Sequence, residues 1–170
     1  KEQDPQYSDN DGAMNQSAGN GASVILSNST NETSDITIGV DVSKFQGTID
    51  WAQAASSGVD FAMIRVGYRA QKTGVIYADT NAKYNMQQAA ANGIKVGVYF
   101  FSSAVNEAEA IEEADWVADF IADYSITYPV AFDCEGFNTS ESRQKSMTKA
   151  ERTDVAVAFL QEIYDKGYTP

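Results

Sequence analysis

Residues 128–136 read YPVAFDCEG, an apolar run that ends in two carboxylates separated by one residue. The flanking Pro and Gly, with Val and aromatic residues between them, favour a buried β-strand over a helix. Side chains alternate across a strand, so Asp133 and Glu135 point to one face and Cys134 points to the other. In parallel α/β folds the carboxyl ends of the strands carry the active site. The stretch therefore predicts a parallel strand that delivers a pair of acids to a functional site.

Two carboxylates at this spacing suit acid–base chemistry. A strand rise of ~3.3 Å per residue places the two Cα atoms roughly 6.5 to 7 Å apart, close enough for each group to shift the pKa of the other. A protonated acid beside an ionised partner is the arrangement that an acid–base hydrolase needs. A D-x-E sequence alone more often marks a solvated strand end, because charged residues mostly lie at surfaces. The rest of the chain has to decide between these readings.

Composition excludes several classes of function. The 170 residues carry a formal net charge of −12 and a pI near 4.2, which argues against nucleic acid or an anionic membrane as a partner. There is no histidine, so Ser-His-Asp and Cys-His catalysis and the commonest zinc sites are excluded, and we expect no metal or cofactor. No stretch approaches the ~20 apolar residues of a membrane span. The one cysteine, Cys134, cannot form an internal disulfide, and we expect it to be buried beneath a helix.

The chain divides at about residue 35. Residues 1–35 are rich in Gly, Ser, Asn, Gln, Asp and Thr, which predicts a polar low-complexity tail or linker that is extended or disordered. From residue 36 onward, strand patterns and helix patterns alternate. We therefore expect one catalytic domain over 36–170, large enough to hold a sizeable core.

The second part of the chain predicts four βα units. Strands are expected at 36–43, 61–68, 94–101 and 128–135, each followed by a helix. The helices are expected at 50–58, from Asp79 or Thr80 to 91, at 107–124 with Ile111 and Tyr124 on its buried face, and from 148 to 167. Asn106 with Glu109, and Thr148 with Glu151, have the spacing of capping boxes. This order predicts parallel strands joined by helical crossovers, with Asp41 as a third acid near a strand end.

Four segments resemble one known family. GVDVSKFQG at 39–47, followed by DW at 50–51, is similar to the first strand and loop of the glycoside hydrolase family 25 lysozymes, the Chalaropsis-type muramidases. FAMIRVGY at 61–68, GVYF at 97–100 and PVAFDCE at 129–135 resemble the next three strands of that family, in the same order and spacing. The resemblance covers roughly residues 36–170.

The resemblance implies an irregular TIM-like β/α barrel. This chain would supply about its first four βα units, which is the N-terminal half to two-thirds of the catalytic domain. It implies cleavage of the β-1,4 bond between N-acetylmuramic acid and N-acetylglucosamine in peptidoglycan. Glu135 matches the general acid of the family and Asp133 its stabilising partner, while Asp41 matches an acid that sets the electrostatics of the site. Four further residues match positions that line the sugar groove: Tyr68, Arg69, Asp79 and Tyr99.

Two other functions remain open at this stage. One is a non-catalytic module that binds peptidoglycan or another glycan, and the other is a hydrolase of a different N-acetylated glycan such as chitin. The residues fit glycoside hydrolysis, which needs two carboxylates and neither a metal nor a histidine, but they do not choose between retaining, inverting and substrate-assisted courses. We further expect a monomer that is secreted or associated with the cell wall.

Overall fold

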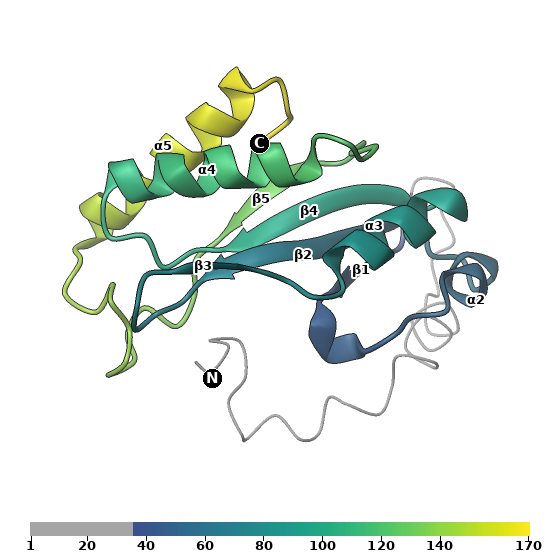
Figure 1. Ribbon diagram of the computed structural model, residues 1–170, viewed down its shortest axis with the longest axis horizontal. Coiled ribbons are helices and arrows are strands. Elements are labelled where there is room, and N and C mark those ends of the chain that lie inside the picture. Colours follow the sequence, from purple (N-terminus) through teal and green to yellow (C-terminus); the bar gives the residue numbers. More distant parts are fainter. Residues whose placement is uncertain (1–35) are drawn as a thin grey trace.

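The computed structural model describes residues 36–170, so the tail expected at 1–35 lies outside the described residues. Four parallel strands form the sheet in the order β1-β2-β4-β5 (Figure 1). Their bounds are Gly39–Val42 for β1, Phe61–Arg69 for β2, Lys95–Phe101 for β4 and Val130–Asp133 for β5. Helices η1 (Lys44–Gln46) and α2 (Trp51–Ser56) follow β1, and α3 (Ala82–Ala91), α4 (Glu107–Ile121) and α5 (Lys149–Asp165) follow the other parallel strands. The predicted α/β architecture of four βα units is confirmed.

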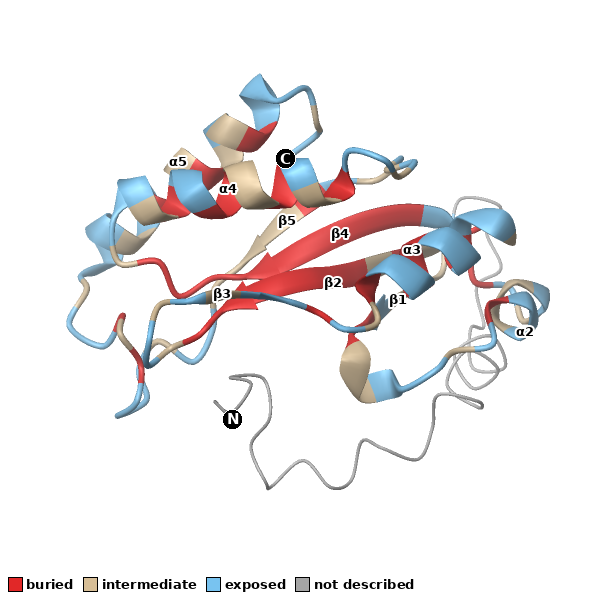
Figure 2. Ribbon diagram, viewed as in Figure 1, coloured by how far each residue is buried: buried red, intermediate tan, exposed pale blue. Residues whose placement is uncertain are grey.

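The main core lies between the sheet and the helices α3, α4 and α5. Val98 and Phe100 of β4, Val117 of α4 and Phe159 of α5 are buried in one cluster, and Figure 2 shows β2 and β4 buried over most of their length, except at their starts. Burial of one large apolar side chain contributes roughly 1.5–3 kcal/mol, so this layer supplies most of the favourable free energy of folding. Ile111, which we expected in the core, is 39% exposed.

Helix starts follow the predicted caps with two differences. Thr148 and Glu151 form a reciprocal capping box at the start of α5. At the start of α4 the Asn106 side chain accepts a hydrogen bond from the Glu109 amide, but the Glu109 carboxylate turns to the amide of Val105 instead, so the expected box is half formed. The predicted start of α3 at Asp79 or Thr80 is wrong, since the helix begins at Ala82. Likewise α4 ends at Ile121 rather than 124.

Strand β3 (Ile76–Ala78) was not predicted. It pairs antiparallel with β2, with Ala70 and Val75 joined by a backbone hydrogen bond of 2.9 Å at the turn. Gly74 in this turn has a φ of +72°, a backbone conformation that glycine adopts without steric cost. The pattern of a glycine turn between apolar runs was the available signal for this hairpin. Over residues 36–170, every helix is too short or too polar to cross a bilayer.

Candidate active site

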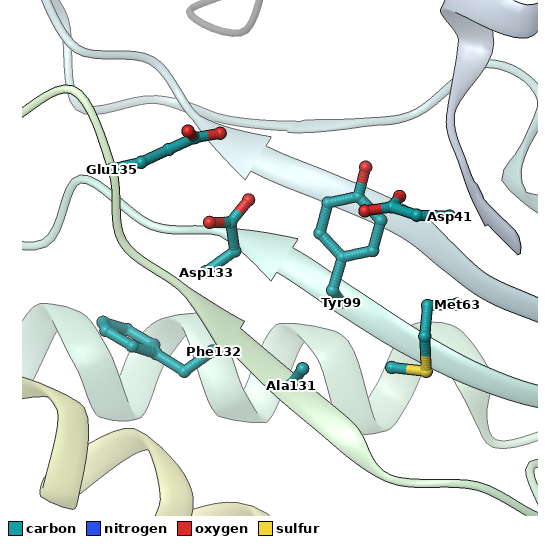
Figure 3. Close-up of a pocket in the computed structure, with 7 residues that line it drawn as sticks. All are labelled: Asp41, Met63, Tyr99, Ala131, Phe132, Asp133 and Glu135. Carbon is teal, nitrogen blue, oxygen red and sulfur yellow. The ribbon is translucent and has the colours of Figure 1, made fainter. Parts of the chain in front are cut away.

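A cavity of about 420 Å³ opens on the sheet face opposite the main core (Figure 3). This volume falls within the range of about 300–1,000 Å³ that is usual for ligand pockets. All four parallel strands contribute to its walls, and the segment after β5 adds one acid. Its lining residues are Asp41, Met63, Tyr99, Ala131, Phe132, Asp133 and Glu135.

Strand register explains why these residues meet. Asp41 is paired with Met63, and Tyr99 with Ala131, so each pair shares one face of the sheet. Asp41 and Asp133 belong to β1 and β5, the two ends of the four-strand order. In a flat sheet three steps of about 4.8 Å would separate those strands by about 14 Å. Both acids nevertheless line one cavity, as is expected where a sheet curls like part of a barrel wall.

The three acids surround the cavity from different sides. Figure 3 shows the carboxylates of Asp41 and Glu135 directed toward the cavity from opposite sides, with Asp133 and Tyr99 between them. Glu135 is exposed and Asp133 is half-buried. The Asp133 carbonyl accepts a 2.8 Å hydrogen bond from the Ser102 amide, which ties the end of β5 to the segment after β4. Asp41 is exposed as well, so the site combines two accessible carboxylates with one that is half-buried.

Burial and several neighbouring groups shift the pKa of Asp41 in opposite directions. Partial burial raises the pKa of Asp41 above its ordinary value, and the negative charge of Glu135 adds to this rise. A hydrogen bond from the Tyr99 hydroxyl and the positive charge of Arg65 act in the opposite direction. Coupling between Asp41 and Glu135 is expected for carboxylates that share one cavity. Such an arrangement can keep one acid protonated while another is ionised.

The structure brings four of the seven predicted site residues to this cavity: Asp41, Tyr99, Asp133 and Glu135. Tyr68, Arg69 and Asp79 are not among its lining residues. Tyr68 is 7% exposed and stacks on Tyr77 with ring centroids 5.6 Å apart, and the Lys44 ammonium lies over its ring. It therefore belongs to an aromatic and cationic layer beside the cavity.

A register shift in β2 separates Arg69 from the cavity. The pairing with β4 is regular up to Arg65 and resumes at Gly67, so one residue is added to the strand between them. After this irregularity Tyr68 shares the face of Arg65, and Arg69 turns toward α4. There its Nε donates to Glu113 Oε1 at 2.6 Å, and its Nη2 donates to Glu112 Oε2 at 2.7 Å. Both Arg69 and Glu113 are buried.

Asp79 is held by backbone and side-chain donors from three segments. Its Oδ2 accepts from Arg65 Nε at 2.9 Å and from the Lys44 amide at 3.0 Å, while Oδ1 accepts from the Asn81 amide at 2.9 Å. Asp79 and Arg65 are both buried. The carboxylate thus joins β2, the start of η1 and the start of α3, which is a structural arrangement.

Cys134 lies on the face away from the two acids, as predicted, but it is only half-buried. Burial raises the pKa of its thiol, which donates to Gln144 Oε1 at 3.7 Å. Met63, Ala131 and Phe132 were missed as lining residues. Strand alternation could have indicated Ala131, which shares the face of Asp133, whereas Met63 needed the pairing register of the parallel strands. Within residues 36–170 no group of three or more His, Cys, Asp or Glu side chains is placed to hold a metal ion.

The sequence of this chain is similar to that of known glycoside hydrolases. Residues 40–170 match the sequence model of the Glycosyl hydrolases family 25. Lysozyme M1 of Streptomyces globisporus is 34% identical over 80 residues, which cover 47% of this chain and 25% of that protein. The chain therefore spans about a quarter of the length of this curated relative.

Solved structures share the fold at low sequence identity. The modular autolysin LytC of Streptococcus pneumoniae, in complex with a synthetic peptidoglycan ligand, superposes with a TM-score of 0.66 at 21% identity, covering 76% of this chain and 30% of LytC. The bacterial lysozyme of Streptomyces coelicolor superposes with a TM-score of 0.58 at 24% identity, covering 78% of this chain and 59% of that one. These likenesses support the curled parallel sheet described above.

Proposed function

This chain belongs to glycosyl hydrolase family 25, and on that premise we propose that its domain cleaves the β-1,4 bond between N-acetylmuramic acid and N-acetylglucosamine in bacterial peptidoglycan. The observation that carries the proposal is the meeting of Asp41, Asp133 and Glu135, from two strands and a loop, around one cavity. A solvated strand end would account for the D-x-E pair but leaves the third acid unexplained.

Glu135 is the proposed general acid. It is an exposed carboxylate at the edge of the cavity, where it can donate a proton to the leaving glycosidic oxygen. Asp133 is the proposed partner whose negative charge stabilises the oxocarbenium-like transition state or an acetamido-assisted intermediate. Asp41 adds charge on the opposite side and is oriented by the hydrogen bond from Tyr99.

The character of the cavity favours a neutral sugar. None of its lining residues is basic, and three of the seven are acidic. Met63 and Ala131 provide apolar surface of the kind that packs against the faces of hexose rings, whereas the Phe132 ring packs against Phe159 on the helix side. The solved complex of LytC with a synthetic peptidoglycan ligand supports peptidoglycan as the substrate class. Cell-wall peptidoglycan as partner implies a secreted or wall-associated enzyme.

The test is release of new reducing ends from purified peptidoglycan, measured with the whole protein that contains this chain. We expect Glu135→Gln to lower cleavage by about 10²- to 10⁴-fold, because general acid catalysis contributes roughly that factor. Glu141→Gln is the matched control, since Glu141 is an exposed glutamate in the same loop. Normal cleavage by Glu135→Gln would contradict the assignment of the acid.

Two alternatives are separated by the same assay. Wild-type protein that co-sediments with peptidoglycan but releases no reducing ends would be a binding module. Cleavage of chitin at a rate equal to or above that of peptidoglycan would indicate a hydrolase of another N-acetylated glycan. For this comparison both polymers are used at equal concentrations of N-acetylhexosamine.

A further inference from the structure

The loop between β5 and α5, residues 134–148, is joined to α4 by a partly buried ion pair. Arg143 faces Glu109 of α4 in bidentate geometry, with Nη2 2.7 Å from Oε1 and Nη1 3.0 Å from Oε2. Arg143 Nη1 also donates to the Ser103 carbonyl at 3.2 Å. Paired bonds of this kind fix direction as well as distance, because the guanidinium and carboxylate planes must align. The loop is thereby fastened to the start of α4 and to the end of β4.

Gln144 provides a second attachment, to the residue between the two acids. Its side chain is fully buried, with 0% exposure. Nε2 donates to the Ala104 carbonyl at 2.9 Å, and Oε1 accepts from the thiol of Cys134 at 3.7 Å. Cys134 stands between Asp133 and Glu135 in the sequence. Because Gln144 holds Cys134 on the helix side, the two acids on either side of it are turned toward the cavity.

The anchor on α4 is itself rigid. Glu109 Oε2 accepts from the Val105 amide at 3.0 Å, and the Glu109 carbonyl accepts from Arg69 Nη2 at 3.0 Å. Although partial burial opposes ionisation, the hydrogen bond from Arg143 helps to hold the pKa of Glu109 below its ordinary value. Glu109 is therefore ionised at neutral pH and remains a partner for Arg143.

We propose that Arg143 and Gln144 are positioning residues that hold Glu135 at the cavity opposite Asp41. The inference rests on the proposed function, in which Glu135 is the acid. Neither side chain lines the cavity, so both act through the loop and not on the substrate. Loss of the Arg143–Glu109 pair should leave Asp133 in place, since the Ser102 amide holds it independently, and should release mainly Glu135.

The first test separates turnover from binding. For Arg143→Gln we expect kcat for peptidoglycan cleavage to fall roughly 10- to 100-fold with KM changed less than twofold, because a misplacement of about 1 Å can cost that much. Arg143→Lys keeps one charged contact to Glu109 and should recover part of the loss. The control is Glu141→Gln. Glu141 lies in the same loop and pairs with Lys72 at 2.8 Å, and both side chains are largely exposed. This variant should retain normal kcat.

The second test needs no activity. In the wild type the charge of Glu135 raises the pKa of Asp41. If Glu135 moves away from the cavity in Arg143→Gln, the pKa of Asp41 should fall. The measurement is a ¹³C NMR titration of the Asp41 carboxyl carbon. Glu141→Gln should leave that titration unchanged. If Arg143→Gln does not fold, Gln144→Met, which is similar in volume and lacks both hydrogen bonds, is measured in its place.

These readouts distinguish failure of the inference from failure of the proposed function. A wild-type protein without cleavage would reject the function, and the Asp41 titration would still decide whether Arg143 positions Glu135. An Asp41 titration that is the same in Arg143→Gln and wild type would overturn the inference, whatever happens to kcat. Equal effects of Glu141→Gln and Arg143→Gln would overturn it as well.

Discussion

The Arg65 guanidinium lies against the Asp79 carboxylate, with Nη2 2.8 Å and Nε 2.9 Å from Asp79 Oδ2, and both side chains are closed to solvent. The same oxygen accepts the Lys44 amide just after β1. Arg65 is also paired with Tyr99 in the sheet register, and its charge acts on Asp41. One buried pair thus links the start of α3 to the segment that follows the strand of Asp41.

Asp79→Asn should therefore destabilise the fold. Removal of one partner from a buried ion pair leaves the other charge uncompensated, which typically costs about 3–5 kcal/mol. We expect the free energy of unfolding, measured by urea titration at pH 7, to fall by that amount. The matched control is Lys72→Met, because the Lys72–Glu141 pair is exposed to solvent. Equal unfolding midpoints for Asp79→Asn and wild type would show that Arg65 finds another partner.

Tyr99→Phe should raise the pKa of Asp41. The Tyr99 hydroxyl stabilises the ionised form of Asp41 by a hydrogen bond, so its removal leaves the effects of burial and of Glu135 less opposed. If Asp41 acts as an ionised group, activity then requires a higher pH, and the acidic limb of the kcat/KM profile should move upward. NMR titration of Asp41 gives the same shift independently.

Tyr77→Phe is the control for this variant. Tyr77 is a tyrosine on β3 outside the cavity, and the substitution keeps its stacking on Tyr68. Its pH profile should match that of the wild type. A downward shift of the acidic limb in Tyr99→Phe would contradict the role given to the hydrogen bond.

Much of the fold was predictable because parallel βα units leave periodic patterns. The strands are apolar on the helix face, and Thr148 with Glu151 marks the start of α5 in the sequence itself. The placement of Asp41, Asp133 and Glu135 at one cavity was predictable, since all three lie at or just beyond the ends of apolar strands. Predicting these acids did not require the pairing register of the strands.

Arg69 was harder to place, because its direction depends on the added residue in β2. Strict alternation would put it on the same face as Arg65, but the shift between Arg65 and Gly67 turns it to α4. Asp79 was predicted to line the sugar groove, but it binds Arg65 instead. This contact joins residues fourteen positions apart in sequence, so it could not be read from the sequence. Sequence spacing gives the type of a side chain and its strand, whereas contacts across a curled sheet depend on tertiary packing.

Glu113 should make stability depend on pH between about 4.5 and 7. Burial raises its pKa from 4.5 to about 7, although hydrogen bonds from Ser102 and Arg69 favour the ionised form. The folded state then binds a proton more tightly than the unfolded state, so this contribution is present at low pH and is lost as pH rises through 7. At about 1.4 kcal/mol per pH unit, its full size is roughly 3 kcal/mol.

Comparison of variants isolates this contribution from the rest of the chain. Glu113→Gln cannot ionise, so its free energy of unfolding should fall less than that of the wild type between pH 5 and 8. Glu112→Gln is the control, because Glu112 is the exposed neighbour that also contacts Arg69. Parallel stability curves for wild type and Glu113→Gln would rule out a raised pKa at this position.

Gly67→Ala should disturb the contact between β2, β3 and α4. A Cβ at Gly67 would lie 2.6 Å from the Tyr77 carbonyl oxygen and 2.7 Å from the nearest ring atom of Trp116. Overpacking of this kind typically costs about 1–3 kcal/mol. We expect a lower Tm by calorimetry, with the cavity-lining residues unchanged in position.

The double variant Gly67→Ala/Trp116→Ala shows which contact limits this position. Without the Trp116 ring, the added methyl group still meets the Tyr77 carbonyl, which belongs to the backbone of β3 and can move only if the hairpin shifts. Part of the Gly67→Ala cost should therefore persist in the Trp116→Ala background. Complete disappearance of that cost would mean that the indole ring alone excludes a side chain at Gly67.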